Sequence, residues 1–296
     1  MPYTIRVVDV FTDRPLSGNQ LAVVLDAEGI PGDVMQRIAK EMNISETTFV
    51  LAPEHPTNAA RVRIFTPGNE LPFAGHPTIG TAWVLFNEGR VPGDALEFSL
   101  EEGIGPVRVR GVRGANGLTF WMTHPTVSFG KVITDRARVA TALGLSEHDL
   151  KGEVPIQVAS TGVPFVYVAL NDARAVDEAI SQKDRLAEVF EQGVFLFAPL
   201  ANNRLYSRMF APHVLDIAED PATGSGSGPL GAFAVKYGLV PRSPKVSIVS
   251  EQGTKMLRQS FIHIELSYPP ERDIPARIEV GGSVVPTLTG ELAGNW

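Results

Sequence analysis

The sequence predicts an α+β protein made of two related halves. Three observations carry this prediction: the length, one long internal repeat, and a helix in each half that is apolar almost all round. The 296 residues suit about two domains, since domains usually contain ~100–200 residues. Apolar residues make up 44% of the chain and charged residues 20%, the balance of a globular protein that buries a core.

Several landmarks occur twice in the same order, at an offset close to half the chain. The offset is 162 − 18 = 144 for two glycines before apolar runs and 192 − 46 = 146 for two polar residues before strands. One long repeat indicates a duplicated domain, because solenoids stack three or more short units. The matched landmarks are Gly18 with Gly162, Glu46 with Gln192, Phe65-Thr66-Pro67 with Phe210-Ala211-Pro212, and His76-Pro77 with Asp220-Pro221.

Each element of the first half follows from its local pattern. Runs rich in Val and Ile predict strands at 3–11 and 20–25. Residues 32–42 place apolar side chains on one face at helical spacing, which predicts an amphipathic helix. An apolar segment between Pro77 and Gly89 predicts a buried helix, because proline favours a first turn and glycine a C-terminus. Further strands are expected near 47–52, 60–65, 95–100, 105–110 and 117–122.

The second half is expected to follow the same plan. Its buried helix runs from Pro221 to Lys236, and Pro229 should kink it or shorten its first turns. A linker is expected near Thr123–Gly130. The pattern therefore predicts a first half at 1–125 and a second half at 126–282.

Composition excludes several classes of function. The chain has no cysteine, which removes disulfides, thiolate metal sites and thiol nucleophiles. The histidines lack metal-ligand spacing and no nucleotide-binding loop is present, so neither a metal nor an organic cofactor is expected. A net charge of −7 without a basic run argues against nucleic acid. With no signal peptide and no long apolar run, a cytoplasmic protein outside the membrane is expected.

The N-termini of the two buried helices are the candidate functional site. A helix N-terminus offers N–H groups and partial positive charge, which suit a carboxylate. Glycine-rich stretches at 74–76 and 223–228 let a small ligand approach the backbone. If both ends serve one cleft, His76 and Asp220 would share a small carboxylate substrate and hold a proton between them.

Each candidate side chain also has a purely structural interpretation. Asp220 suits a helix N-cap, His76 suits a buried hydrogen-bonded histidine, and Glu46 suits a solvated surface position. The sequence leaves these alternatives open. If Glu46 is catalytic, proton transfer relies on one base, because the corresponding Gln192 cannot titrate.

Three motifs closely resemble those of the phenazine-biosynthesis isomerase family, the PhzF-like proteins. The resemblance covers nearly the whole chain. It implies the α+β fold of diaminopimelate epimerase, with two pseudo-symmetric halves that each curve a mixed sheet around a central buried helix. Residues 283–296 would complete the first half. The motifs are Ser45-Glu46-Thr47, Pro72-Phe73-Ala74-Gly75-His76-Pro77-Thr78 and Glu219-Asp220-Pro221-Ala222-Thr223-Gly224-Ser225, beside an opening that includes Gly18-Asn19-Gln20-Leu21.

The resemblance also implies a cofactor-free isomerase that forms a homodimer. The family's phenazine enzyme moves one proton along a dihydro-hydroxyanthranilate ring and so shifts a double bond. Glu46 would be the proton shuttle, with His76, Asp220 and Ser225 as its catalytic neighbours. The residues expected to bind substrate are Asn19, Ser45, Gly75, Thr78, Gly224 and Gly226.

Two other functions stay open at this point. An amino-acid racemase of the same fold needs an acid and a base on opposite faces of the carbon, which the absent thiols and Gln192 disfavour. A non-catalytic protein that binds a small carboxylate would use the same two lobes. Glu46 argues against it, because a carboxylate beside an anionic ligand is costly unless it is protonated or reacts. The natural substrate is not fixed by the sequence.

Overall fold

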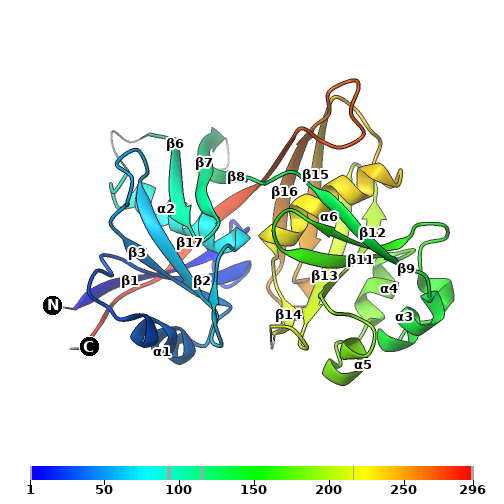
Figure 1. Cartoon of the computed structure of the whole chain (residues 1–296), viewed down its shortest axis with the longest axis horizontal. Helices are drawn as coiled ribbons and strands as arrows, with labels where there is room; N and C mark the ends of the chain where they lie inside the picture. Colours follow the sequence, from blue (N-terminus) through cyan, green and yellow to red (C-terminus); the bar gives the residue numbers. More distant parts are fainter. Residues whose placement is uncertain (1, 92–94, 115–116, 216, 295–296) are drawn as a thin grey trace. The chain divides into compact units, whose positions relative to one another are not determined.

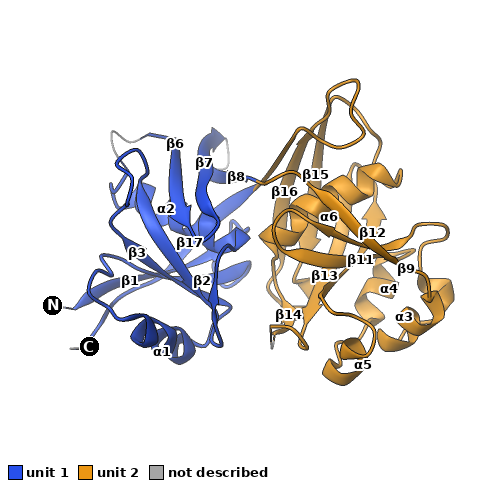
Figure 2. Ribbon diagram, in the orientation of Figure 1, with its two compact units in different colours: residues 1–123, 281–296 blue, residues 124–280 orange. Residues whose placement is uncertain are grey.

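The chain folds into two compact α+β units. The computed structural model describes residues 2–91, 95–114, 117–215 and 217–294 (Figure 1). Unit 1 is Met1–Thr123 with Gly281–Trp296, and unit 2 is His124–Val280 (Figure 2). The last two positions of the segment expected at 283–296 lie outside the described residues. Among the helices described, none is both long and apolar enough to cross a membrane.

The strands of unit 1 pair around one central helix. Strand β1 (Tyr3–Val10) pairs antiparallel with β2 (Asn19–Val24) and with β17 (Arg277–Leu292). Strand β2 pairs in parallel with β3 (Glu46–Leu51), which pairs antiparallel with β4 (Ala60–Phe65). One part of β4 then pairs with β5 (Glu70–Leu71) and another with β6 (Glu97–Glu102). The series continues through β7 (Gly105–Gly114) to β8 (Gly117–Thr123), and β8 pairs with β17.

Two helices of unit 1 match the sequence patterns that predicted them. Helix α1 (Gly32–Met42) has the predicted bounds, and its apolar face packs on the sheet around Phe49 and Phe65. Helix α2 (Gly75–Asn87) is buried over most of its length, as its apolar sequence predicts. It begins two residues before Pro77. Proline costs little there, because the first N–H groups of a helix have no partner within it.

Unit 2 repeats this arrangement with additional helices. Strands β11 (Pro164–Ala169) and β12 (Gly193–Leu200) are parallel, as β2 and β3 are. The other strands are β9 (Ser128–Ile133), β10 (Ile156–Ser160), β13 (Arg204–Ala211), β14 (Ile217–Asp220), β15 (Lys245–Gln252) and β16 (Ser260–Ser267). Helices α3 (Arg136–Ala142), α4 (Ala173–Glu178) and α5 (Lys183–Ala187) cover one face, and short 3-10 turns lie at Glu147–Asp149 and Thr254–Met256.

Helix α6 (Gly224–Lys236) is the buried helix of unit 2, and it corrects the predicted start at Pro221. Pro229 lies inside it and offers no N–H to the Ser225 carbonyl. The glycines at 224–228 belong to the helix and not to a flexible loop. A Cβ on Gly226 would lie 2.8 Å from the Phe195 ring, so glycine permits close packing at this position.

The helix bounds also correct the pairing of His76 with Asp220. The central helices begin 224 − 75 = 149 residues apart, so the counterpart of His76 is Ser225. The hydroxyls of Thr78 and Ser227 support this register, because each donates to the carbonyl four residues earlier. Asp220 corresponds instead to Leu71, since Leu71 pairs with Ile64 and Asp220 pairs with Met209, the equivalent position of β13.

The counterpart of Glu46 differs from the prediction as well. Glu46 is the first residue of β3, and Gly193 is the first residue of the equivalent strand β12. Gln192 precedes that strand. Neither Gly193 nor Gln192 carries an acid, so the conclusion that unit 2 offers no second carboxylate at this place is unchanged.

Replacing Gly80 by Val should destabilise unit 1. A Cβ at this position of α2 would lie 2.6 Å from Leu21 Cδ2 and 2.8 Å from Val10 Cγ2. Overpacking of this kind costs about 1–3 kcal/mol of unfolding free energy. Urea denaturation followed by circular dichroism measures the loss. Gly68→Val is the control, because the nearest atom to a Cβ there is Thr66 Oγ1 at 3.9 Å. Equal stability of the two variants would contradict this packing of α2.

Candidate active site

Glu46 is a buried carboxylate at the start of a strand. It opens β3, next to Leu21 of β2, and only 8% of its surface is exposed. Its Oε2 lies 3.2 Å from Nε2 of His76, in the first turn of α2. The structure therefore contradicts the surface interpretation of Glu46. A carboxylate is seldom buried without a specific arrangement around it, because burial removes its hydration.

His76 is a neutral imidazole with a defined tautomer. Burial lowers the pKa of His76 to about 3, against a hydrogen bond to the Gln20 carbonyl that acts in the opposite direction. The Asn19 amide nitrogen lies 3.2 Å from Nδ1 and can only donate, so Nδ1 accepts. The proton therefore sits on Nε2, which lies 3.2 Å from the Gln20 carbonyl. The same nitrogen lies 3.2 Å from Glu46 Oε2.

The remaining candidates of unit 1 lie close to this pair. Asn19 is fully buried and orients the imidazole. Ser45 is half-buried and precedes Glu46 in the chain. Gly75 is the first residue of α2, after Ala74, whose side chain forms no capping hydrogen bond in the described structure. The Thr78 hydroxyl is occupied within the unit, by the Ala74 carbonyl and by Glu102.

In unit 2, Asp220 ends β14 and lies just before the central helix. It is buried with 6% exposed surface, and its Oδ2 accepts a hydrogen bond of 2.5 Å from the Thr223 hydroxyl. Thr223, and not Asp220, is the N-cap residue of α6. The capping interpretation of Asp220 is therefore wrong, and a buried carboxylate is held beside the helix start.

Gln252 fixes the backbone around Asp220. Its side-chain nitrogen donates to the Asp220 carbonyl at 2.7 Å and to the Thr223 hydroxyl at 3.0 Å. Its oxygen accepts from the Thr223 N–H at 3.1 Å. The Thr223 hydroxyl thus accepts from Gln252 and donates to Asp220.

Gly224, Ser225 and Gly226 form the first turn of α6. Ser225 is half-buried between two buried glycines, so its hydroxyl is the more accessible polar group of that turn. The Gly226 carbonyl accepts a hydrogen bond of 2.7 Å from the buried Tyr167 hydroxyl. Backbone N–H groups and a serine hydroxyl at a helix start suit a carboxylate ligand.

The sequence reasoning missed three residues that support these two clusters: Glu102, Thr223 and Gln252. A signal for two of them exists in the chain. Glu101-Glu102-Gly103 at the end of β6 returns as Glu251-Gln252-Gly253 at the end of β15, 251 − 101 = 150 residues later. Both glycines lie against a proline, Pro72 or Pro221, at distances that leave no room for a Cβ.

Comparison with known proteins relates the chain to isomerases. A family model described as "Phenazine biosynthesis-like protein" (PhzC-PhzF) matches residues 8–290. The trans-2,3-dihydro-3-hydroxyanthranilate isomerase of Pseudomonas aeruginosa is 35% identical over 278 residues, with 94% of each chain covered. An uncharacterised isomerase of Mesorhizobium japonicum is 36% identical over 297 residues, with 96% of each chain covered.

Solved structures agree with the fold class that the sequence predicts. The Bacillus anthracis phenazine biosynthesis protein of the PhzF family has a TM-score of 0.90 at 25% identity, with 99% of both chains covered. A probable proline racemase from Agrobacterium radiobacter shares the fold, with a TM-score of 0.67 at 14% identity over 99% of this chain and 93% of that one. The predicted epimerase-like α+β fold is thus confirmed, and the chain belongs to the phenazine biosynthesis-like (PhzC-PhzF) family.

Proposed function

We propose that this protein is an isomerase that moves a proton on a small carboxylate substrate, with Glu46 as the base. The observation that carries the proposal is the buried Glu46 carboxylate 3.2 Å from a neutral His76. Active sites are where carboxylates are buried beside polar partners at some cost in stability. Similarity to named isomerases over almost the full length supports the same reaction class.

The neutral state of His76 limits the roles that the two residues can play. With a pKa of about 3, the imidazole does not supply a proton as an acid near neutral pH. Its one N–H, on Nε2, is donated to the Gln20 carbonyl, and the uncharged ring lies 3.2 Å from the Glu46 carboxylate. In the proposed step Glu46 takes a proton from one carbon, the double bond shifts, and the same proton returns to another carbon. Charge and atoms balance without a cofactor.

The cluster in unit 2 is proposed to bind the same substrate. The first turn of α6, with Gly224 and Ser225, would hold the substrate carboxylate, and Asp220 would take part in the same chemical step. These roles rest on the family motifs and on the buried network that holds Asp220. A homodimer is part of the proposal, by analogy with the family.

The substrate to test first is the one named for the Pseudomonas aeruginosa relative, trans-2,3-dihydro-3-hydroxyanthranilate. Cyclic and amino carboxylates extend the screen. In heavy water, an isomerase returns a product with a shifted double bond. An amino-acid racemase would return the labelled mirror-image amino acid, and a binding protein would return no product from any of these acids.

Glu46→Gln should nearly abolish turnover while the protein stays folded. The amide keeps the shape of the side chain and removes the base, which typically contributes ~10²–10⁴-fold to the rate. Product formation by proton NMR measures the effect, and circular dichroism checks the fold. Glu41→Gln, an exposed position of α1, is the matched control and should keep wild-type turnover. Near-normal turnover of Glu46→Gln would rule out Glu46 as the base.

His76 should remain neutral between pH 5 and 8. Its pKa of about 3 in the folded protein lies below the usual 6.5, so folding is favoured above pH 6.5 and this contribution is lost as the pH falls towards 3. Nitrogen-15 NMR of the imidazole should show one tautomer, protonated at Nε2, with constant shifts across this range. His76→Gln assigns the signal. A midpoint of titration between pH 5 and 8 would contradict the buried, neutral state.

Glu46 and Asp220 should show strong non-additivity if both act in one chemical step. Each single variant, Glu46→Gln or Asp220→Asn, should lower kcat/KM, and the double variant should lose far less than the product of the two losses. Steady-state kinetics of the four proteins measures the coupling. Asp273→Asn, an exposed carboxylate of unit 2, is the control and should combine with Glu46→Gln without coupling. Losses that simply multiply would show that the two residues act independently.

A further inference from the structure

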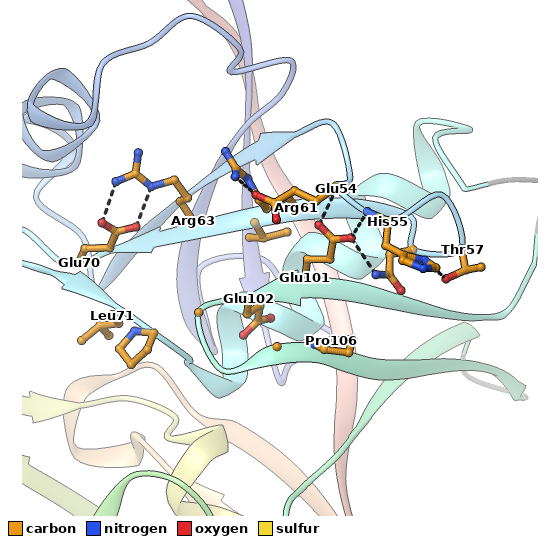
Figure 3. Close-up of a pocket in the computed structure, with 15 residues that line it drawn as sticks. Glu54, His55, Thr57, Arg61, Arg63, Glu70, Leu71, Glu101, Glu102 and Pro106 are labelled. Carbon is orange, nitrogen blue, oxygen red and sulfur yellow. Dashed lines mark hydrogen bonds and ion pairs between the residues drawn. The ribbon is translucent and has the colours of Figure 1, made fainter.

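A second buried carboxyl group lies beneath the first turn of α2. Glu102 ends β6 with 7% of its surface exposed, and its Oε1 lies 2.5 Å from the Thr78 hydroxyl oxygen. Its Oε2 has no hydrogen-bond partner among the described residues. Figure 3 shows it in the wall of a surface pocket of unit 1, on the opposite side of its strand from Glu101. The described residues that line this pocket do not include Glu46 or His76.

The hydrogen-bonding capacity of Thr78 favours the neutral form of Glu102. The Thr78 hydroxyl has one hydrogen but lies within bonding distance of two oxygens, the Ala74 carbonyl at 2.7 Å and Glu102 Oε1 at 2.5 Å. The Ala74 carbonyl can only accept. Both contacts are satisfied when Thr78 donates to Ala74 and a protonated Glu102 donates to Thr78. The other oxygen is then an uncharged C=O, which costs less to bury than an ionised carboxylate.

Unit 2 has a neutral amide at the equivalent place. Arg61 pairs with Glu101 as Tyr206 pairs with Glu251, so the next residues, Glu102 and Gln252, correspond. Gln252 donates through its side-chain nitrogen to Thr223, the residue that precedes α6. An amide and a protonated carboxylic acid both offer one donor and one acceptor, whereas a carboxylate offers only acceptors.

Charged side chains around the pocket form ion pairs or hydrogen bonds with their neighbours. Arg63 forms a two-point ion pair with Glu70, Arg61 pairs with Glu54, and Glu101 accepts from the Glu54 and His55 N–H groups and from Asn58. Burial is the largest effect on Glu102 and raises its pKa to about 8, against the hydrogen bond that the ionised form would accept from Thr78, which lowers it. The charged groups that line the pocket are Glu54, His55, Arg61, Arg63, Glu70, Glu101 and Glu102.

We propose that Glu102 is a positioning residue that works as a neutral carboxylic acid. Through Thr78 it holds the first turn of α2, and with it His76, two residues before Thr78 in the same turn. Gln252 does the same for the first turn of α6 through Thr223. Deprotonation of Glu102 would remove the donor and place an uncompensated charge beneath the helix start. The consequence for turnover rests on the proposed function; the protonation state does not.

The first experiment tests protonation without any substrate. A folded-state pKa near 8 lies above the usual 4.5, so Glu102 favours folding at low pH, and this contribution is lost as the pH rises from 4.5 to 8. Relative to Glu102→Gln, the wild-type unfolding constant should rise about tenfold for each pH unit from 5 to 7. Urea denaturation at pH 5, 6 and 7 measures it. If the ratio of the wild-type unfolding constant to that of Glu102→Gln does not change with pH, the proposal is overturned.

The neighbouring carboxylate is the control for that experiment. Glu101 is half-buried, and the Asn58 hydrogen bond lowers its pKa, so its contribution changes only below pH 4.5. Glu101→Gln should therefore keep the wild-type dependence on pH between 5 and 7. If Glu101→Gln abolishes that dependence and Glu102→Gln does not, the assignment to Glu102 is wrong.

The second experiment tests positioning by kinetics. The wild type should lose kcat near pH 8, whereas Glu102→Gln should keep kcat at pH 6–7 and lack this alkaline loss. Glu102→Ala and Thr78→Val remove the support, and kcat should fall on the order of tenfold to a hundredfold, because small displacements of catalytic groups are costly. An alkaline loss of kcat that is identical in wild type and Glu102→Gln overturns the positioning role. Failure of the Glu46 assignment would appear separately, as an active Glu46→Gln with an unchanged stability result for Glu102.

Discussion

The structure depends on how the first turn of a largely buried helix is held. Helices α2 and α6 are buried within their own units over most of their length, so water does not hydrate their first turns freely. In the described structure neither Ala74 nor Thr223 forms a side-chain capping bond to its helix. The fold therefore fixes each start from the side, by Glu102 through Thr78 and by Gln252 through Thr223. The N–H groups at Gly75 and Gly224 are thereby held in place.

The cost of burying charge also bears on how His76 and Glu46 can be buried together. An ionised pair at this depth would need desolvation of two charges, which is expensive. The neutral imidazole avoids half of that cost, and Asn19 fixes its orientation at the Nδ1 side. In unit 2 the hydrogen bonds are different. The carboxylate of Asp220 accepts from the Thr223 hydroxyl, which is oriented by the side-chain amide of Gln252. A neutral imidazole thus lies beside the acidic group in unit 1, and a hydroxyl donates to the acidic group in unit 2.

Much of this arrangement could be predicted from the sequence, because local patterns determine it. The amphipathic spacing of α1 and the apolar run of α2 gave helices close to those observed. The register of the repeat could not be predicted, since the link between paired residues is longer in unit 2. Ile64 and Leu71 are 7 residues apart, whereas Met209 and Asp220 are 11 apart, and the 4 extra residues shift every later equivalence. The match of His76-Pro77 with Asp220-Pro221 was therefore wrong, because the helix starts make Ser225 the counterpart of His76. The burial of Glu46 and the support by Glu102 depend on contacts between distant strands, which no local pattern contains.

The pairing of the last strand, β17, has a consequence for folding during synthesis. Tyr3 of β1 pairs with Leu292 of β17, so unit 1 joins residues from both ends of the sequence. Unit 2 is one uninterrupted stretch, His124–Val280. During synthesis the ribosome therefore releases all of unit 2 before the final strand of unit 1 exists. Contacts of such large sequence separation form slowly, and proteins usually fold their N-terminal domain first. Here the sheet of unit 1 cannot be completed until β17 has been made, so β1 keeps one unpaired edge until then. An unpaired edge of this kind can pair with another chain.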